Sequence, residues 1–236
     1  MFISVISAKG GVGSSTVSAL FTSVLSKSRK TLLIDAANGD LHGICSVDNI
    51  KYSFNDWLAS ENPNEQSLNN ISLEIDQNLS FVGSDKCAGI KTIRDVHPSD
   101  EVVSEIIKAS PSCVLDLGTT NSAFAQSCVE ASDLVVMVMR QCYLSLLCAT
   151  AHPYMRNVDA IVVIKEPGRT ISSEELAEAL HIDCVIEIDA QKDFARSIDA
   201  GVIAHRAPKK LIEPINMFLA DVLGEQERSY DISSLR

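Results

Sequence analysis

The chain of 236 residues carries 31 acidic and 20 basic side chains, a formal net charge of −11, and 46% of its residues are hydrophobic. This length and composition predict one sizeable core and a single domain. The acidic balance argues against strong nucleic-acid binding, which needs a basic surface. A short basic cluster of Arg206, Lys209 and Lys210 is interpreted as the solvated start of a helix rather than a DNA-binding patch.

The seven cysteines form no C-x-x-C pair, and several lie inside apolar runs. Buried, reduced thiols in a cytoplasmic protein explain this pattern better than disulfides or zinc ligands. The first apolar run, residues 2–6, is too short for a signal peptide, and no run approaches the roughly eighteen residues of a spanning helix. We therefore expect a cytoplasmic protein without direct membrane insertion, which reaches a pole or membrane through a partner.

A glycine-rich stretch follows the first apolar run and reads Ser7-Ala8-Lys9-Gly10-Gly11-Val12-Gly13-Ser14-Ser15-Thr16. Apolar residues at helical spacing come next and predict a helix: Val17, Leu20, Phe21, Val24 and Leu25. Glycines allow a tight turn whose N–H groups point at an anion, and a helix N-terminus adds partial positive charge. The stretch therefore predicts a phosphate cradle. A glycine turn without a ligand is the alternative.

The stretch is close to the standard P-loop, G-x-x-x-x-G-K-[ST], but not identical to it. Ser14 stands where the lysine that contacts the β- and γ-phosphates belongs, and Ser15 takes the place of the hydroxyl that binds Mg²⁺. Another lysine, Lys9, precedes the first glycine pair.

Residues 9–15 resemble the deviant Walker A motif, K-G-G-x-G-K-[ST], of the MinD/ParA superfamily of nucleotide-dependent positioning proteins. The serine at position 14 is similar to the CpaE/TadZ branch and to the septum-site-determining-like proteins of actinobacteria. The resemblance implies that ATP and Mg²⁺ bind here, and that Lys9 reaches across a face-to-face homodimer to the other subunit's nucleotide. It also implies protein partners in a pilus-assembly, secretion or cell-division apparatus.

Two later apolar runs end in an acid, as parallel strands do when their carboxyl ends face a ligand site. Residues 31–35 end in Asp35, and residues 113–117 contain Asp116, followed by a glycine and small polar residues. The resemblance to the superfamily implies that Asp116 takes the Walker B position, which holds a water of the Mg²⁺ shell. The implied metal-binding residues are Ser15 and Asp116. The implied nucleotide-binding residues are Lys9, Gly10, Gly11, Val12, Gly13, Ser14, Ser15, Thr16, Asp35 and Asp116.

The D-x-D pattern that the superfamily carries after its second strand is incomplete here. Ala37 stands in place of the second acid, which helps to position the attacking water. Asp40 is either a catalytic substitute or an ordinary turn residue after Gly39. Lys9 is the other candidate for a catalytic role. Because phosphoryl transfer depends on positioned charges, the missing lysine and acid predict ATP binding with weak or absent hydrolysis, a slow ATPase at best.

Strands alternating with helices predict an α/β fold, the single-domain three-layer P-loop NTPase type, with helices on both faces of a mainly parallel sheet. Ser53 and Ser172 are expected to cap helices, and residues 143–154 to form one helix. The polar stretch 61–70 is expected to be an exposed loop. We expect residues 1–224 to form the nucleotide-binding domain and residues 225–236 a polar tail. That tail is unlike the basic amphipathic tail by which MinD holds membranes. Further strands are expected at 79–83, 134–139, 160–164 and 184–188, and a helix at 99–109.

Two functions remain open at this point. The first is an ATP-binding positioning protein that forms a nucleotide-linked dimer and localises pilus-assembly or cell-division machinery. The second is a nucleotide-free scaffold that keeps the fold and the dimer face, favoured by Ser14, Ala37 and the absence of an asparagine after residues 160–164. The intact glycine loop and the two strand-terminal acids oppose the scaffold. A DNA-segregating ATPase would need a basic surface that this chain lacks.

Overall fold

The computed structural model describes residues 1–37, 41–48, 50–84, 97–190 and 192–233. An eight-stranded sheet has the order β3-β4-β2-β5-β1-β6-β7-β8. Every pairing is parallel except that of β3 with β4. The strands are β1 (Phe2–Ser7), β2 (Thr31–Asp35), β3 (Leu73–Asp76), β4 (Leu79–Val82), β5 (Ser112–Gly118), β6 (Leu134–Arg140), β7 (Ala160–Lys165) and β8 (Val185–Asp189).

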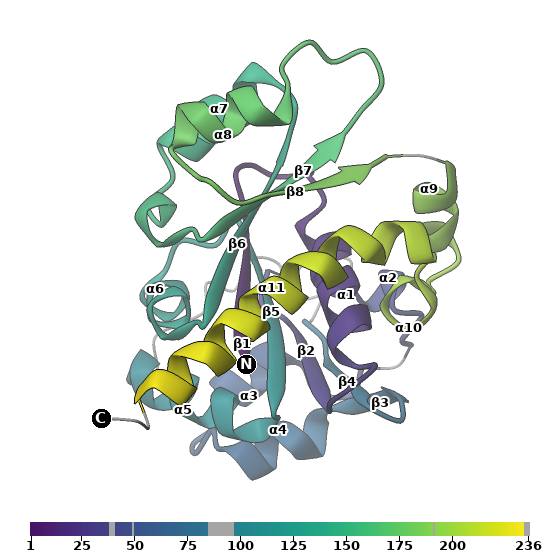
Figure 1. The fold of residues 1–236 in the computed structure, drawn as a ribbon. Helices are drawn as coiled ribbons and strands as arrows, with labels where there is room; N and C mark the ends of the chain where they lie inside the picture. Colours follow the sequence, from purple (N-terminus) through teal and green to yellow (C-terminus); the bar gives the residue numbers. More distant parts are fainter. Residues whose placement is uncertain (38–40, 49, 85–96, 191, 234–236) are drawn as a thin grey trace.

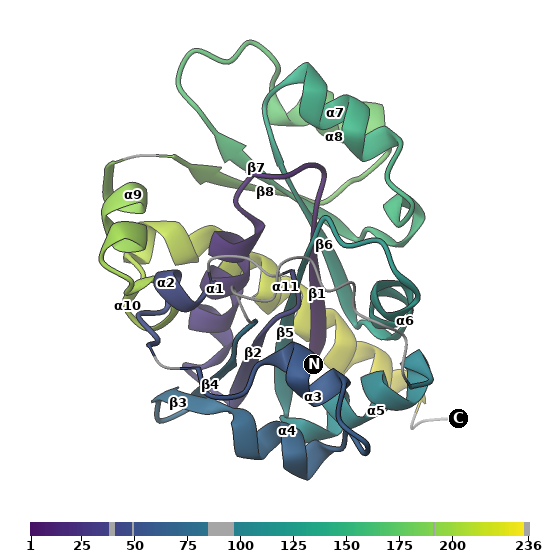
Figure 2. The ribbon, with the colours of Figure 1, turned by 180° about the vertical axis from the view of Figure 1, so that it is seen from behind.

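Helices cover both faces of this sheet, which makes the three layers that the sequence predicts (Figures 1 and 2). The helices on one face are α1 (Ser14–Leu25), α2 (Leu41–Ile44), α9 (Lys192–Asp199), α10 (Ile203–Arg206) and α11 (Lys209–Ser233). Those on the other are α3 (Phe54–Leu58), α4 (Glu65–Ile71), α5 (Ser99–Ala109), α6 (Ala123–Ala131), α7 (Tyr143–Thr150) and α8 (Ser173–Leu180), with a 3-10 turn at Met155–Asn157. The predicted α/β class is confirmed.

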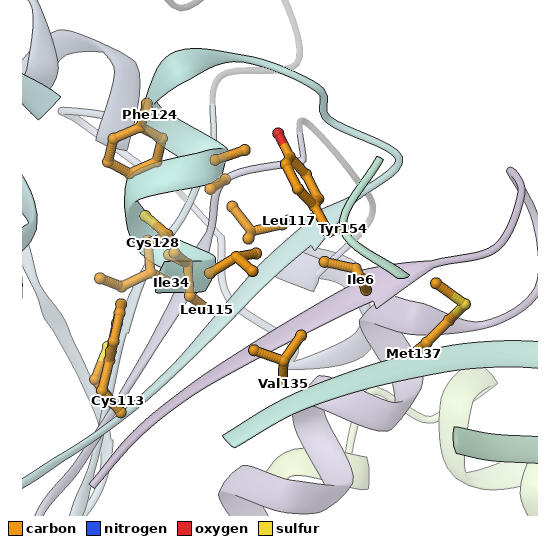
Figure 3. Close-up of a cluster of buried hydrophobic side chains, with 14 of the residues drawn as sticks. Ile6, Ile34, Cys113, Leu115, Leu117, Phe124, Cys128, Val135, Met137 and Tyr154 are labelled. Atoms are coloured by element: carbon orange, nitrogen blue, oxygen red, sulfur yellow. The ribbon is translucent and has the colours of Figure 1, made fainter. Parts of the chain in front are cut away.

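The continuous apolar strands supply two cores at once, because successive side chains of a strand point to opposite faces. In β6, Val135 and Met137 belong to the core under α3 to α8, whereas Val136 and Val138 belong to the core under α1 and α11. Figure 3 shows part of the first core, in which Phe124 and Tyr154 lie over strand residues. Burial on both faces explains why these strands read as unbroken apolar runs rather than as alternating ones.

The expected loop at 61–70 is wrong, because its second half begins the helix α4. Asn64 caps this helix by accepting the Ser67 N–H at 2.9 Å, and Leu68 is fully buried. Trp57 of α3 donates its indole N–H to the Ser67 hydroxyl at 2.9 Å, which ties the two helices together. Leu68 is the one fully buried apolar residue of α4, so this stretch shows no apolar periodicity and tertiary contacts decide its structure.

The other expected elements are largely confirmed, including the capping boxes led by Ser53 and Ser172. The helix expected over 143–154 is shorter, because α7 ends at Thr150. Pro153 lies just beyond, and proline neither donates an N–H nor allows the residue before it an easy α conformation. Across the described ranges, the helices are too short or too polar to span a bilayer.

We predict that Leu68→Ala will lower the free energy of unfolding by about 2–5 kcal/mol, since it empties a fully buried site. Asn70→Ala, an exposed change in the same helix, is the control and should stay within about 0.5 kcal/mol of the wild type. Chemical denaturation measures both. A small effect of Leu68→Ala would mean that α4 does not pack on the core.

Candidate nucleotide site

The glycine loop lies at the carboxyl end of β1, in the middle of the sheet. Ala8 donates its N–H to Val138 of β6 at 3.0 Å, so the chain stays beside β6 up to this edge. It then turns through Gly11 and Gly13, with φ of 74° and 106°, values that favour glycine because other residues carry a Cβ. Gly13 is the N-cap of α1, so the loop leads directly into a helix N-terminus.

The loop surrounds open space rather than packed atoms. A Cβ built on Gly10 or Gly11 would meet no heavy atom within 4 Å. At the same place the first N–H groups of α1 lack partners within the helix, which makes the end of a helix favourable for an anion. Open space beside both glycines and a helix N-terminus next to them are what a phosphate would require here.

The predicted loop residues divide into two groups by burial. The partly exposed residues are Lys9, Ser14 and Ser15. The ammonium of Lys9 donates a hydrogen bond to the Gly10 carbonyl at 3.2 Å. Val12 and Thr16 are buried, and Val12 belongs to the core under α1 and α11. These two residues can therefore contribute backbone N–H groups to a phosphate, whereas the exposed three can contribute side chains.

Asp35 and Asp116 meet at the same edge, because β2 and β5 pair in a register that sets one opposite the other. Both carboxyls are buried. The Oδ1 of Asp35 accepts the Ala37 N–H, and the Oδ1 of Asp116 accepts the Gly118 N–H, each at 3.1 Å. Each acid thus holds the first turn of the loop that follows its own strand.

Burial, and after it the charge of Asp35, raise the pKa of Asp116 to about 7. The hydroxyls of Ser15 and Ser14 and the N–H of Gly118 oppose this rise by stabilising the carboxylate. The two acids therefore repel each other when both are ionised. The hydroxyls of Ser14 and Ser15 lie close to the carboxyl of Asp116. A cation at this place would remove the repulsion.

These residues fit a hydrated Mg²⁺ ion beside a nucleotide phosphate. The second oxygen of Asp116, Oδ2, is buried and makes no hydrogen bond of ordinary distance and angle, although the two serine hydroxyls approach the carboxyl. Oxygen ligands are what Mg²⁺ prefers, and it keeps several waters when one or two carboxylates hold it. Ser15 and Asp116 are the residues in position to hold the ion or its waters.

The loops after β2 and β5 touch each other. A Cβ on Gly118, whose φ is 52°, would lie 2.8 Å from the Cβ of Ala37. The missing second acid of the D-x-D pattern is therefore replaced by a small side chain packed against the turn after β5. Asp40, the expected catalytic substitute, lies outside the described residues.

A charged network at this edge went unnoticed in the sequence. Arg140 at the end of β6 donates to Glu166 at 2.7 Å, and Arg169 donates its Nε to the same carboxylate at 2.8 Å. The hydrogen bond from Arg169 lowers the pKa of Glu166, with further lowering from the charges of Arg140 and Lys9. The pair of Glu166 and Arg169 is local, three residues apart in one loop, but only the pairing of β6 with β7 brings Arg140 to it.

The sequence matches no protein-family model and no curated protein. Solved structures do resemble the chain. A ParA family ATPase from Chlorobium tepidum is 21% identical with a TM-score of 0.75, over 92% of this chain and 98% of its own. MinD in the MinC:MinD cell-division complex of Aquifex aeolicus is 20% identical with a TM-score of 0.71, over 93% and 96%.

The septum site-determining protein MinD of Pyrococcus horikoshii, complexed with Mg-ADP, has a TM-score of 0.73 at 16% identity, over 94% of this chain and 98% of its own. This chain has the ParA/MinD fold. The fold that the resemblance of residues 9–15 implies is thereby confirmed. In the ParA/MinD fold of this chain, the glycine loop and both acids lie at one edge of the sheet.

We predict that Asp116→Asn will stabilise the metal-free protein clearly more at pH 8 than at pH 5. The folded-state pKa, about 7, lies above the ordinary value of 3.8, so ionising Asp116 costs stability as the pH rises from about 4 to 7. The asparagine removes this cost, roughly 2–4 kcal/mol. Thermal melts in a chelator at both pH values measure it. Equal melting shifts at pH 5 and pH 8 would contradict the raised pKa.

Proposed function

We propose that this protein binds ATP with Mg²⁺ at the glycine loop and acts as a MinD/ParA-like positioning protein. The observation that carries the proposal is the convergence at one edge of an anion-binding loop and two buried, register-paired carboxylates, Asp35 and Asp116. The loop suits phosphates, and the carboxylates suit the divalent cation that accompanies them. The solved MinD structure that holds Mg-ADP on the same fold supports this combination of ligands.

Each residue then has a defined part. The N–H groups of residues 10–16 surround the phosphates, and Ser15 and Asp116 hold Mg²⁺ or its waters. Asp35 orients the loop after β2, since it already accepts the Ala37 N–H there. The bound Mg²⁺ supplies positive charge beside the phosphates. Lys9, on the rim of the cradle, supplies a second positive charge, from its own subunit or from the other one.

Hydrolysis is proposed to be slow or absent. Ser14 brings a hydroxyl where a lysine would neutralise the charge that develops on the phosphates, and Ala37 has no group that could orient a water. Losing one charged donor of this kind costs about 2–4 kcal/mol in the transition state. The site would then serve as a binding switch rather than as an efficient catalyst.

The proposed homodimer forms through the face that carries the cradle. Helix α7 begins directly after β6, at the same edge, and presents Tyr143, Leu144 and Leu147 with 69%, 55% and 52% of their surface exposed. Apolar side chains gathered on one exposed helix support a protein contact at that place. Nucleotide bound beside Lys9 would link dimer formation to ATP.

The proposed partners are protein components of a pilus-assembly apparatus of the Tad/Cpa type or of the division machinery. The serine at position 14, which is similar to the CpaE/TadZ and septum-site-determining-like branch, supports this choice. The MinD of the MinC:MinD complex shows that this fold can be joined to a division partner. Such a partner would take the protein to a pole or membrane. A nucleotide-free scaffold is the second candidate, favoured by Ser14 and Ala37.

Calorimetric titration with Mg²⁺·ATP tests the binding. We predict micromolar affinity for the wild type and at least tenfold weaker binding for Lys9→Ala, because a charge beside the phosphates is lost. Lys27→Ala is the control, an exposed lysine just beyond the far end of α1, and should bind like the wild type. No heat and no thermal stabilisation at millimolar ATP would leave the scaffold as the function.

We predict that replacing Leu144 and Leu147 together by glutamate will prevent an ATP-dependent dimer without lowering the melting temperature, since both side chains are exposed. Ile107→Glu on α5, also exposed, is the matched control. Light scattering behind a sizing column, with and without Mg²⁺·ATP, measures the mass. A variant that still dimerises with ATP would place the dimer contact elsewhere.

A further inference from the structure

The strand β8 is the edge strand at the other end of the sheet from β3. Among the described strands it pairs with β7 alone. Two hydrogen bonds define which of its residues face β7. The Cys184 carbonyl accepts the Ile161 N–H at 3.0 Å, and Ala190 donates its N–H to the Lys165 carbonyl at 2.9 Å. Backbone groups of neighbouring residues in a strand point to opposite sides, so the even-numbered residues of β8 bond to β7.

Val185 and Glu187 are the odd-numbered residues inside this strand. Their backbone N–H and C=O groups therefore point away from the sheet, and no described residue hydrogen bonds to them there. An edge of this kind is a template for another extended chain.

A groove of about 590 Å³ runs along this edge, between β8 and α11. Figure 1 shows α11 passing beside β8 on the front of the sheet. On the helix side, Leu211, Pro214 and Phe218 line the groove, and Met217 is 64% exposed beside them. On the strand side its lining includes residues 184–189. The groove thus combines an apolar wall with a strand edge that offers hydrogen bonds.

The charged residues that line the groove are mostly acidic. Glu187 and Asp189 come from β8, and Glu213 and Asp221 come from α11, against the single basic residue Lys210 in the lining. The carboxylate of Glu187 pairs with Lys165 at 2.9 Å and is also stabilised by the Ser173 hydroxyl of α8, so it lies on the face of the sheet away from α11. On the α11 side, Glu213 and Asp221 outnumber the basic residue Lys210. An acidic excess remains, and it favours a basic ligand.

We propose that this groove binds an extended basic segment of another protein, which adds a strand to β8. The unused backbone groups of the edge favour an extended chain over a helix, because a helix has no free N–H and C=O groups along its length. Side chains of such a chain alternate between its two sides. Its apolar residues can then pack on the apolar side chains of α11, while its basic residues reach the acidic rim formed by Glu213 and Asp221. About five residues of partner match the length of β8.

A second copy of this chain is a poorer occupant. Two β8 edges pairing antiparallel around Glu187 would bring like charges opposite each other, which destabilises a strand pair. Acidic residues on an edge strand commonly prevent such self-pairing. The groove also contains no residue of the glycine loop, so this proposal does not depend on nucleotide binding.

The test uses the full chain without nucleotide and a fluorescent heptapeptide that alternates lysine with valine, capped at both ends. Two further peptides serve as controls: the same sequence N-methylated on alternate residues, and one that alternates glutamate with valine. Glu213→Lys combined with Asp221→Lys reverses the charge of the two acidic side chains that α11 contributes to the groove. Glu178→Lys on α8, exposed and outside the groove, is the matched control. Thermal melts establish that each variant is folded.

We expect the lysine peptide to bind below about 1 mM, at least tenfold more tightly than either control peptide or than to the doubly reversed protein. Hydrogen exchange of the Val185 and Glu187 amides should slow when it binds. Equal binding of the N-methylated peptide, no loss in the reversed protein, or no binding at millimolar peptide would overturn the proposal. So would a concentration-dependent dimer without peptide that protects the same two amides, since it would assign the edge to a second copy.

Discussion

The parallel pairing of the central strands is the constraint on which the rest of this structure depends. Parallel strands buried on both faces must all end at the same edge of the sheet, where their following loops meet. Because β1 lies between β5 and β6, with β2 next to β5, the glycine loop comes beside Asp116 and Asp35. The helices that cover both faces favour this arrangement, since they bury the apolar residues of the central strands against one of two cores.

The arrangement places two acids where water is excluded, and this has electrostatic consequences. Desolvation and the charge of Asp35 hold Asp116 partly protonated near neutral pH in the metal-free protein. A divalent cation would favour its ionised form, so metal binding and proton release are coupled at this edge. Ser14 leaves the cradle less positive than a standard P-loop, which makes the cation and Lys9 more important for holding phosphates.

The carboxyl edge of the sheet and its edge strand β8 suit different kinds of ligand. The carboxyl edge offers fixed N–H groups, hydroxyls and carboxylates, which suit a phosphate and its metal. The β8 side offers backbone groups and an apolar wall with an acidic rim, which suit a polypeptide. The two places share no residues, so the two proposed ligands can bind independently.

By itself, the sequence determined most of the local elements and the fold class. The glycine spacing around Gly11 and the acids closing apolar runs indicated the fold and the site, because such patterns report backbone conformation and strand ends directly. Helix α4 escaped notice because Leu68 alone anchors it. Only the tertiary structure decided that Glu166 joins Arg140, and that β8 and α11 enclose a groove. These contacts depend on strand order and register, which no local periodicity encodes.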